Sequence, residues 1–113
     1  MNVTELVPVV NCRVRFSLRY RKFVPNDAGC YALAAFNGDV LYVGLTDNLC
    51  RRFAQHRDSK VKRSETPRGG AFWFYYLTCG VKQTYCIERT WINQHVEFHG
   101  AFPVLNGINS PVH

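Results

Sequence analysis

A β-hairpin is the feature that most constrains the fold, because Asn37 and Gly38 separate two apolar, β-forming runs. This dipeptide accepts the positive φ angles of a type I′ turn, which joins antiparallel strands through a two-residue loop. With these residues as the loop, Phe36 pairs with Asp39, and each step back on one strand matches a step forward on the other. The sequence therefore predicts a hairpin of defined register.

Two tyrosines lie on the arms of this hairpin, one on each strand. The predicted register pairs Tyr31 with Gly44 and places Tyr31 and Tyr42 on one face as diagonal neighbours, about 7–8 Å apart. At that separation two phenol groups can converge on one phosphate, and Gly44 leaves room for a backbone to approach. A three-residue loop would shift the pairing by one and put the tyrosines on opposite faces. The alternative interpretation is that two strand tyrosines simply pack together.

A helix is predicted immediately after the hairpin, over residues 45–56. Thr46 and Asp47 are candidate N-caps, and Leu49 and Phe53 form an apolar stripe at i, i+4 spacing. An arginine can grip a phosphate with a planar pair of donors, and a neutral histidine can accept a proton near physiological pH. Both residue types lie on the polar stripe of this helix, which consists of Asn48, Arg52 and His56.

In these motifs the chain resembles the GIY-YIG nuclease family. The resemblance spans residues 29–106 and rests on Gly29-Cys30-Tyr31, a spacer of ten residues, Tyr42-Val43-Gly44, and then Asn48, Leu49, Arg52, His56, Glu88 and Asn106. Cys30 replaces the isoleucine of the family motif, and Leu45 stands where many members carry a lysine or another polar residue. The resemblance implies an α+β fold, with a small three-stranded antiparallel sheet flanked by helices. It also implies an endonuclease that uses Mg²⁺, or Mn²⁺ in its place, to hydrolyse DNA phosphodiester bonds.

The same resemblance implies roles for the residues of the hairpin and first helix. Tyr31 positions or deprotonates the attacking water, and His56 helps as a proton acceptor. Because a free tyrosine has a pKa of about 10, Tyr31 needs a nearby metal, arginine or histidine to act as a base at neutral pH. Arg52 stabilises charge that builds on the phosphoryl oxygens, and Tyr42 orients the phosphate.

Glu88 is the candidate ligand for Mg²⁺. It lies in a predicted helix over residues 82–99, ended by Gly100, at the edge of an apolar face that contains Trp91. The chain has only eight acidic residues, whereas two-metal nucleases need several carboxylates around two ions about 4 Å apart. One carboxylate and water can hold a single Mg²⁺. The alternative is an ordinary surface glutamate.

Asn106 is the last residue of the resemblance. It follows Pro103-Val104-Leu105 and is predicted to fix the local backbone and the surroundings of Tyr42. The alternative interpretation is a turn asparagine without a further role.

The charge of the chain favours a polyanionic partner. The net charge is +6 with a pI of about 9.3, and basic residues gather in two segments, residues 13–22 and 57–68. We therefore expect DNA as the partner, whether single-stranded, branched or duplex. The predicted nucleic-acid-binding residues are Arg13, Arg15, Arg51, Arg57, Lys60, Lys62, Arg63 and Arg68.

Length and pattern predict one compact domain of 113 residues. Residues 1–24 are expected to form a basic N-terminal arm or strand, in which apolar and polar residues alternate from Arg13 to Tyr20. Residues 25–113 are expected to form the catalytic domain. Within it, residues 58–70 are predicted as a mobile polar loop and residues 71–77 as the third strand.

The sequence favours an intracellular protein, cytoplasmic or nuclear if eukaryotic. It has no apolar stretch of the roughly 20 residues that span a bilayer and no signal-peptide pattern. Five cysteines without CxxC spacing indicate reduced, mostly buried thiols. No membrane association is expected. A homodimer or a partner protein would allow both strands of a duplex to be cut.

Two other classes of protein remain open from the sequence. One is a non-catalytic single-stranded nucleic-acid-binding module that stacks bases on its aromatic run, Trp73, Phe74, Tyr75 and Tyr76. The other is a structural zinc protein that uses Cys79, Cys86, His95 and His99, although these cysteines are far apart for a zinc knuckle. The complete set of candidate catalytic residues favours the nuclease, because binding alone does not require it.

Overall fold

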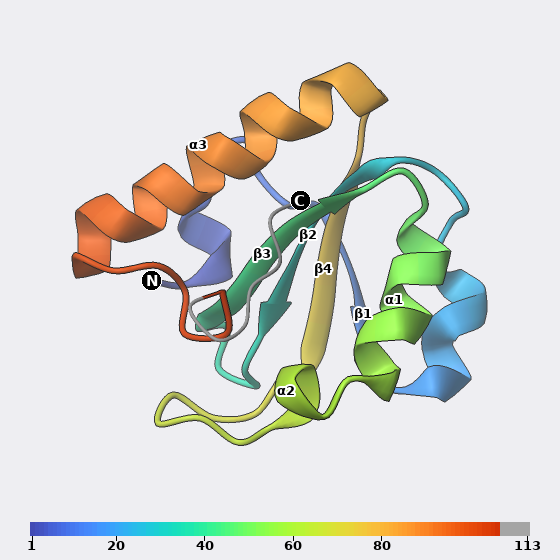
Figure 1. Ribbon diagram of the computed structural model, residues 1–113, viewed down its shortest axis with the longest axis horizontal. Helices are drawn as coiled ribbons and strands as arrows, with labels where there is room; N and C mark the ends of the chain where they lie inside the picture. Colours follow the sequence, from blue (N-terminus) through green and yellow to red (C-terminus); the bar gives the residue numbers. More distant parts are fainter. Residues whose placement is uncertain (107–113) are drawn as a thin grey trace.

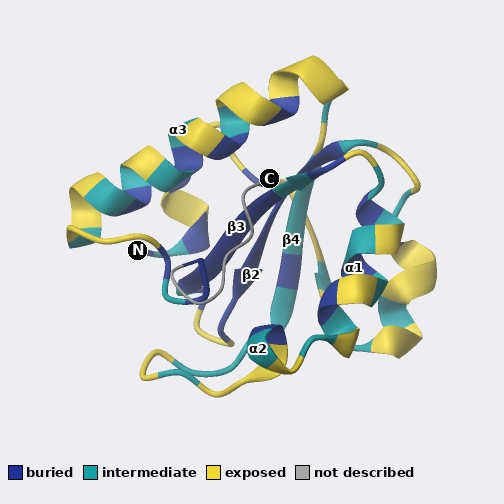
Figure 2. Ribbon diagram, viewed as in Figure 1, coloured by how far each residue is buried: buried dark blue, intermediate teal, exposed yellow. Residues whose placement is uncertain are grey.

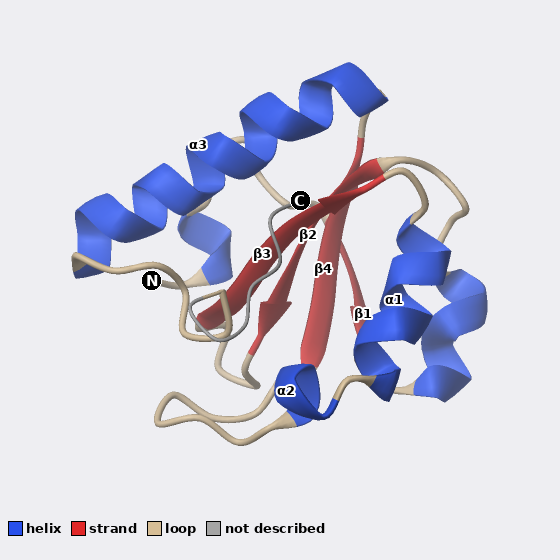
Figure 3. Ribbon diagram, viewed as in Figure 1, coloured by secondary structure: helices blue, strands red, loops and turns tan. Residues whose placement is uncertain are grey.

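The computed structural model describes residues 1–106, which form an antiparallel sheet between two layers of helix (Figure 1). The sheet has four strands in the order β1-β4-β2-β3. The α3 helix and the N-terminal segment cover one face, and α1 with η2 covers the other (Figure 3). The elements in chain order are η1 (Val3–Glu5), β1 (Cys12–Arg15), η2 (Leu18–Phe23), β2 (Gly29–Ala34), β3 (Val40–Thr46), α1 (Leu49–Asp58), α2 (Lys60–Arg63), β4 (Trp73–Thr78) and α3 (Val81–His99).

The α+β fold with an antiparallel sheet flanked by helices is confirmed. The N-terminal segment, expected as an arm or strand beside a three-stranded sheet, supplies the fourth strand, β1, which pairs with β4 at the edge of the sheet. The predicted alternation up to Tyr20 ends early, because η2 begins at Leu18, whose side chain is exposed. The backbone N–H of Phe16 still donates to Phe72 O at 2.8 Å, next to the last β1–β4 pair, Arg15 with Trp73.

The hairpin of β2 and β3 closes through a three-residue loop, so the predicted two-residue type I′ turn and its Phe36–Asp39 pair are wrong. The N–H of Ala35 donates to Asp39 O at 2.9 Å, and the N–H of Gly38 donates to Ala35 O at 2.8 Å. Gly38 has a φ of 95°. A turn followed by a left-handed glycine is the usual form of a three-residue hairpin loop.

A β-bulge in β3 cancels the one-residue shift in strand register that this loop would cause. Leu33 pairs with Tyr42 but Ala34 pairs with Val40, so Leu41 is an extra residue of β3. Leu41 and Tyr42 consequently pack into the same core, although they are consecutive in a strand. Tyr31 therefore lies opposite Gly44 as predicted, and the two tyrosines share a face.

The central strand β2 is buried along its whole length, because both faces of the sheet are covered (Figure 2). On the side of α1, Tyr31 and Leu33 pack against Phe53 and Phe74. On the side of α3, the facing residues of β2 are small and pack around Trp91; they are Cys30, Ala32 and Ala34. This alternation of large and small residues sets the different characters of the two faces.

The outer edge of β3 is covered by segments from near both ends of the chain. Val40 N donates to Met1 O at 3.0 Å, and Leu105 N donates to Leu41 O at 2.8 Å. These bonds satisfy backbone groups that an edge strand would otherwise expose. They also bring the segment before Asn106 beside the second tyrosine motif.

The other predicted elements are confirmed in part. The α3 helix ends at His99, and Gly100 caps it with a φ of 75°, as predicted. Residues 58–70, predicted as a loop, contain the short helix α2. None of the five cysteines forms a disulfide, but only Cys30 is buried, so the expectation of mostly buried thiols is wrong. Among the described residues, none of the helices has the length and apolar character needed to cross a membrane.

Candidate active site

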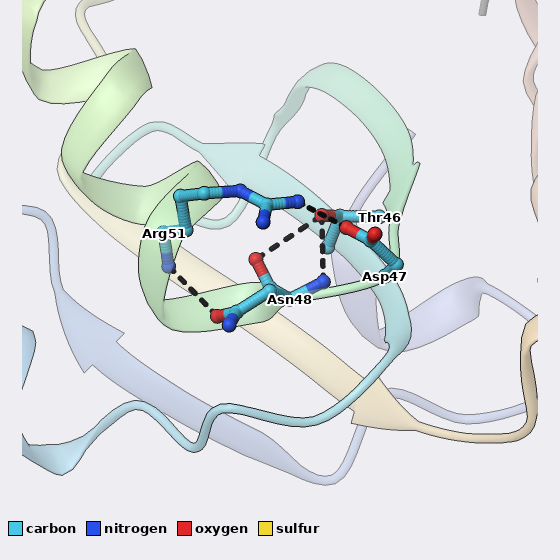
Figure 4. A network of polar contacts seen from close by, with 4 residues as sticks. All are labelled: Thr46, Asp47, Asn48 and Arg51. Atoms are coloured by element: carbon cyan, nitrogen blue, oxygen red, sulfur yellow. Dashed lines mark hydrogen bonds and ion pairs between the residues drawn. The ribbon is translucent and has the colours of Figure 1, made fainter.

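The α1 helix begins at a cap that differs from the predicted ones (Figure 4). Asn48 is the N-cap, and its side chain accepts a hydrogen bond from Arg51 N at 3.0 Å. The hydroxyl of Thr46 accepts from Asn48 N at 3.0 Å, and Asp47 forms an ion pair with exposed Arg51. Asn48 is therefore used to start the helix, where such a cap contributes about 1 kcal/mol.

Tyr31 lies at the centre of the site with its side chain fully buried. Its hydroxyl is 2.5 Å from Nε2 of His56, which projects from the last turn of α1. Its ring stacks on Phe74, with ring centroids 5.1 Å apart. The ring also lies over Gly44, where an added Cβ would come within 2.5 Å of Tyr31 Cζ. The space above Gly44 is thus filled by Tyr31, and the predicted approach of another backbone at Gly44 is wrong.

Tyr42 lies next to Tyr31, between α1 and α2. Its ring centroid is 6.0 Å from that of Tyr31 and 5.2 Å from that of His56. The ammonium of Lys62 lies over the Tyr42 ring, 4.1 Å from the centroid. The structure therefore brings both tyrosines, one imidazole and one lysine into a single cluster.

Burial dominates the acidity of both phenols. The pKa of Tyr31 is raised well above its ordinary value, first by burial and then by Tyr42, while Arg52 opposes the rise. The pKa of Tyr42 is also raised, mainly by burial, and Arg52 again opposes. Both phenols are therefore protonated at neutral pH. With Tyr31 protonated, its hydroxyl can donate to Nε2 of a neutral His56.

Arg52 lies on α1, one turn before His56, and is half-buried. Because it opposes the rise in pKa of both tyrosines, its charge acts at both phenols. Among the described residues, its buried Nε has no hydrogen-bond partner. A guanidinium with a spare donor beside two phenols can bind a phosphoryl oxygen.

Glu88 approaches the site from α3, on the opposite face of the sheet. Its side chain is 7% exposed, and its negative charge contributes to the raised pKa of Tyr42. Within residues 1–106, no three His, Cys, Asp or Glu side chains gather around a possible metal position. The zinc set considered above, Cys79, Cys86, His95 and His99, therefore does not form a metal site in the described residues. A single buried carboxylate is a hard oxygen donor that fits Mg²⁺, which keeps several waters and uses one or two carboxylates.

Asn106 holds the backbone of the second tyrosine motif. Its Oδ1 accepts from Val43 N and its Nδ2 donates to Val43 O, both at 2.8 Å. The side chain is buried and acts as one more pairing residue along the edge of β3. Val43 precedes Gly44 and follows Tyr42, so this contact supports the strand on which the site is built.

The predicted nucleic-acid-binding residues fall into three groups. Lys62 lies in the tyrosine cluster and is only 6% exposed, and it belongs to the helix α2 and not to a mobile polar loop as predicted for residues 58–70. Arg57 is half-buried against Phe16. The others are exposed: Arg13 and Arg15 on β1, and Arg51, Lys60, Arg63 and Arg68 around α1 and α2. The burial of Lys62 depends on the position of α2, and a basic run in the sequence gives no signal for it.

The aromatic run of β4 does not form the base-stacking platform considered above. Phe74 is fully buried in the core, and successive residues of a strand point to opposite faces. The guanidinium of Arg13 also covers the Trp73 ring, at 3.9 Å from its centroid. These side chains therefore pack within the sheet and do not form a continuous ring surface on which bases could stack.

Comparison with known proteins gives a consistent result. The profile of the family described as GIY-YIG catalytic domain matches residues 27–99. The chain is also similar to "UvrABC system protein C" of Lactobacillus gasseri and of two strains of Lactobacillus delbrueckii subsp. bulgaricus, with 29% identity over 80 residues in each case. Each match covers 69% of this chain, which spans only 13% of the length of these relatives. Because the family profile matches more than half of the chain, including both tyrosine motifs, the chain belongs to the GIY-YIG family and carries the catalytic domain of these endonucleases.

Proposed function

We propose that this chain is a Mg²⁺-dependent endonuclease that hydrolyses DNA phosphodiester bonds at the cluster formed by Tyr31, Tyr42 and His56. The observation that carries the proposal is the 2.5 Å contact between the Tyr31 hydroxyl and His56 Nε2. This contact links a buried phenol to a proton acceptor beside Arg52 and Glu88. A pure binding module has no need of such a pair.

The contact supports a proton relay for the attacking water. The pKa of Tyr31 is raised by burial, so the phenol alone is a poor base at neutral pH. As the water oxygen bonds to phosphorus, its proton passes to the Tyr31 oxygen while the Tyr31 proton passes to His56 Nε2. The bond from phosphorus to the leaving oxygen then breaks, its electron pair stays on that oxygen, and the oxygen takes up a proton from water. Arg52 stabilises the charge on the phosphoryl oxygens, and Tyr42 orients the phosphate.

Glu88 would hold the Mg²⁺ ion in this scheme, and Mn²⁺ could replace it. The bound ion supplies Lewis-acid stabilisation of charge on the phosphate and leaving oxygens. Glu88 lies close enough to act electrostatically on Tyr42, which supports its place in the same site.

The proposed substrate is DNA, in single-stranded, branched or duplex form. The net charge of +6 and the exposed cations around α1 and α2 support a polyanionic partner. We assign catalysis to residues 25–113 and treat residues 1–24 as an arm that completes the sheet through β1. A homodimer or a partner protein is proposed for cutting both strands, and a DNA substrate implies action inside the cell, in the cytoplasm or a nucleus.

The test is cleavage of labelled single-stranded and duplex DNA with Mg²⁺ or EDTA, comparing the native chain with Glu88→Ala and Arg52→Ala. Glu97→Ala, an exposed acid on the same helix as Glu88, is the matched control. Cutting that needs the metal, disappears in both site variants and persists in the control supports the nuclease. Tight binding without cutting by the native chain would contradict it and favour a binding module.

A further inference from the structure

Lys62 is a buried cation that the mechanism above does not use. Its side chain is 6% exposed, and its ammonium lies 4.1 Å from the centroid of the Tyr42 ring. The lysine sits in α2, whose N-cap Ser59 accepts a hydrogen bond from the Lys62 backbone N–H. The neighbouring cations of the same helix, Lys60 and Arg63, are exposed. Only Lys62 of these three points into the tyrosine cluster.

The ion pair found within residues 1–106 joins Arg51 to Asp47 and does not involve the Lys62 ammonium. Burial lowers the pKa of Lys62. The face of an aromatic ring offsets part of the cost of removing an ammonium from water, but it leaves the donors of the ammonium available. A buried cation of this kind is best satisfied by an anionic ligand.

The cluster already holds the groups that would surround such an anion. Arg52 acts electrostatically on both phenols, and the Tyr42 ring contacts both Lys62 and His56. Leu45, which stands where many family members carry a lysine or another polar residue, packs against the core cluster that contains Trp91, on the opposite face. Lys62 is therefore the lysine that this chain brings to the two tyrosines.

We propose that Lys62 binds a non-bridging oxygen of the scissile phosphate and, together with Arg52, stabilises the charge that grows on that phosphate during hydrolysis. This inference rests on the proposed nuclease function and adds a catalytic residue to it. It distinguishes Lys62 from exposed cations such as Lys60, whose proposed role is to position DNA through its backbone.

The first test compares Lys62→Gln with Lys82→Gln, at an exposed lysine of α3, in single-turnover cleavage and in DNA binding. Each variant removes one positive charge from the chain. We expect Lys62→Gln to slow cleavage by about 100-fold, as for removal of one transition-state donor, and Lys82→Gln to leave the rate at saturating enzyme unchanged. Lys62→Arg should recover part of the rate. Equal rates for the two glutamine variants would overturn the proposal.

A sulfur substitution separates a phosphate contact from a structural role. In the native chain, replacing one non-bridging oxygen of the scissile phosphate with sulfur should slow cleavage for one diastereomer more than for the other. In Lys62→Gln this difference should shrink, because the contact to that oxygen is already lost. An unchanged difference in a folded Lys62→Gln chain would contradict a direct contact.

A measurement without cleavage separates this inference from the proposed function. With lysine labelled at its side-chain nitrogen, a short oligonucleotide in EDTA should shift the NMR signal of Lys62, identified by its absence in Lys62→Arg. A shift in a chain that never cuts would support Lys62 as a phosphate ligand while the nuclease proposal fails. Absence of the shift at saturating DNA would overturn the Lys62 proposal, even if the native chain cuts.

Discussion

The two faces of the sheet differ in chemistry as well as in packing. On the side of α1, β2 and β3 present Tyr31 and Tyr42, and His56 and Lys62 close around them. On the side of α3, β2 presents only small residues against Trp91, with Glu88 as a buried acid of that helix. In the proposed mechanism, one face therefore holds the proton-transfer groups, and the other supplies the carboxylate.

This difference follows from strand alternation together with one bulge. Alternation sends Tyr31 to one side and Cys30 and Ala32 to the other. The small side chains leave room for α3 to pack on β2 and β3, which brings its carboxylate into electrostatic range of Tyr42. A catalytic site can thus combine residues from both faces when it lies close to an edge strand such as β3.

The largest expected effect tests whether the α3 face supplies a single essential acid. Glu88→Gln removes the charge but preserves the shape, so we expect cleavage in Mg²⁺ to fall by about 1000-fold or more. Single-turnover cleavage measures this loss, and urea unfolding checks that the variant is folded. A similar loss in the exposed control Glu97→Gln would show that the effect is not local.

Gly44→Ala tests the close packing of the tyrosine face. The new Cβ would lie 2.5 Å from Tyr31 Cζ and 2.9 Å from Tyr42 Cε2, so both rings must move. We expect a loss of about 1–3 kcal/mol in the free energy of unfolding, together with reduced cleavage. Gly80→Ala, where the nearest atom is 3.5 Å away, is the control for urea unfolding. Unchanged stability in Gly44→Ala would contradict the described packing.

Asn106→Ala tests the support of the β3 edge. It removes the partners of Val43 N and O, and one lost pair of this kind costs about 1–3 kcal/mol when the groups stay buried. Because Tyr42 is next in the strand, cleavage should also fall, but by less than in Glu88→Gln. Urea unfolding and single-turnover rates measure both. The exposed Asn93→Ala serves as control, and equal stability of the two variants would argue against the contact.

The smallest effect concerns alkaline pH. The pKa of Tyr31 is raised in the folded chain, so the unfolded chain releases this proton first, near pH 10. The contribution of Tyr31 to the free energy of unfolding is fully present below that pH. It falls by about 1.4 kcal/mol per pH unit as the pH rises toward the pKa of Tyr31 in the folded chain. Tyr31→Phe should therefore lose less stability than the native chain between pH 9 and 11 in urea unfolding. Parallel losses would contradict the raised pKa.

The sequence predicted the shared face of the tyrosines, but through a register that was only partly correct. Asn37-Gly38 indicated a two-residue turn, whereas the loop has three residues and Leu41 forms a bulge that compensates. A leucine is compatible with a regular strand and with a bulge. Local pattern therefore does not distinguish the two, and the outcome depends on which residues pack best into the two cores.

Other features of the site could not be predicted from the local sequence, each for a different reason. Thr46, Asp47 and Asn48 are all good caps, and only the geometry of the chain leaving β3 selects Asn48. The burial of Lys62 requires α2 to fold over Tyr42, which is a tertiary contact. By contrast, α3 and its end at Gly100 were predictable, because amphipathic spacing and a C-terminal glycine are local signals.

The central claim is that Tyr31 and His56 act as one proton-transfer unit. A double-mutant cycle with Tyr31→Phe and His56→Ala, measured by single-turnover DNA cleavage in Mg²⁺, tests this claim directly. Each single variant should slow cleavage by about 10²–10⁴-fold, within the range of general acid–base catalysis. The double variant should be no slower than the slower single variant, because each change disables the same unit. Losses that multiply in the double variant would contradict the relay.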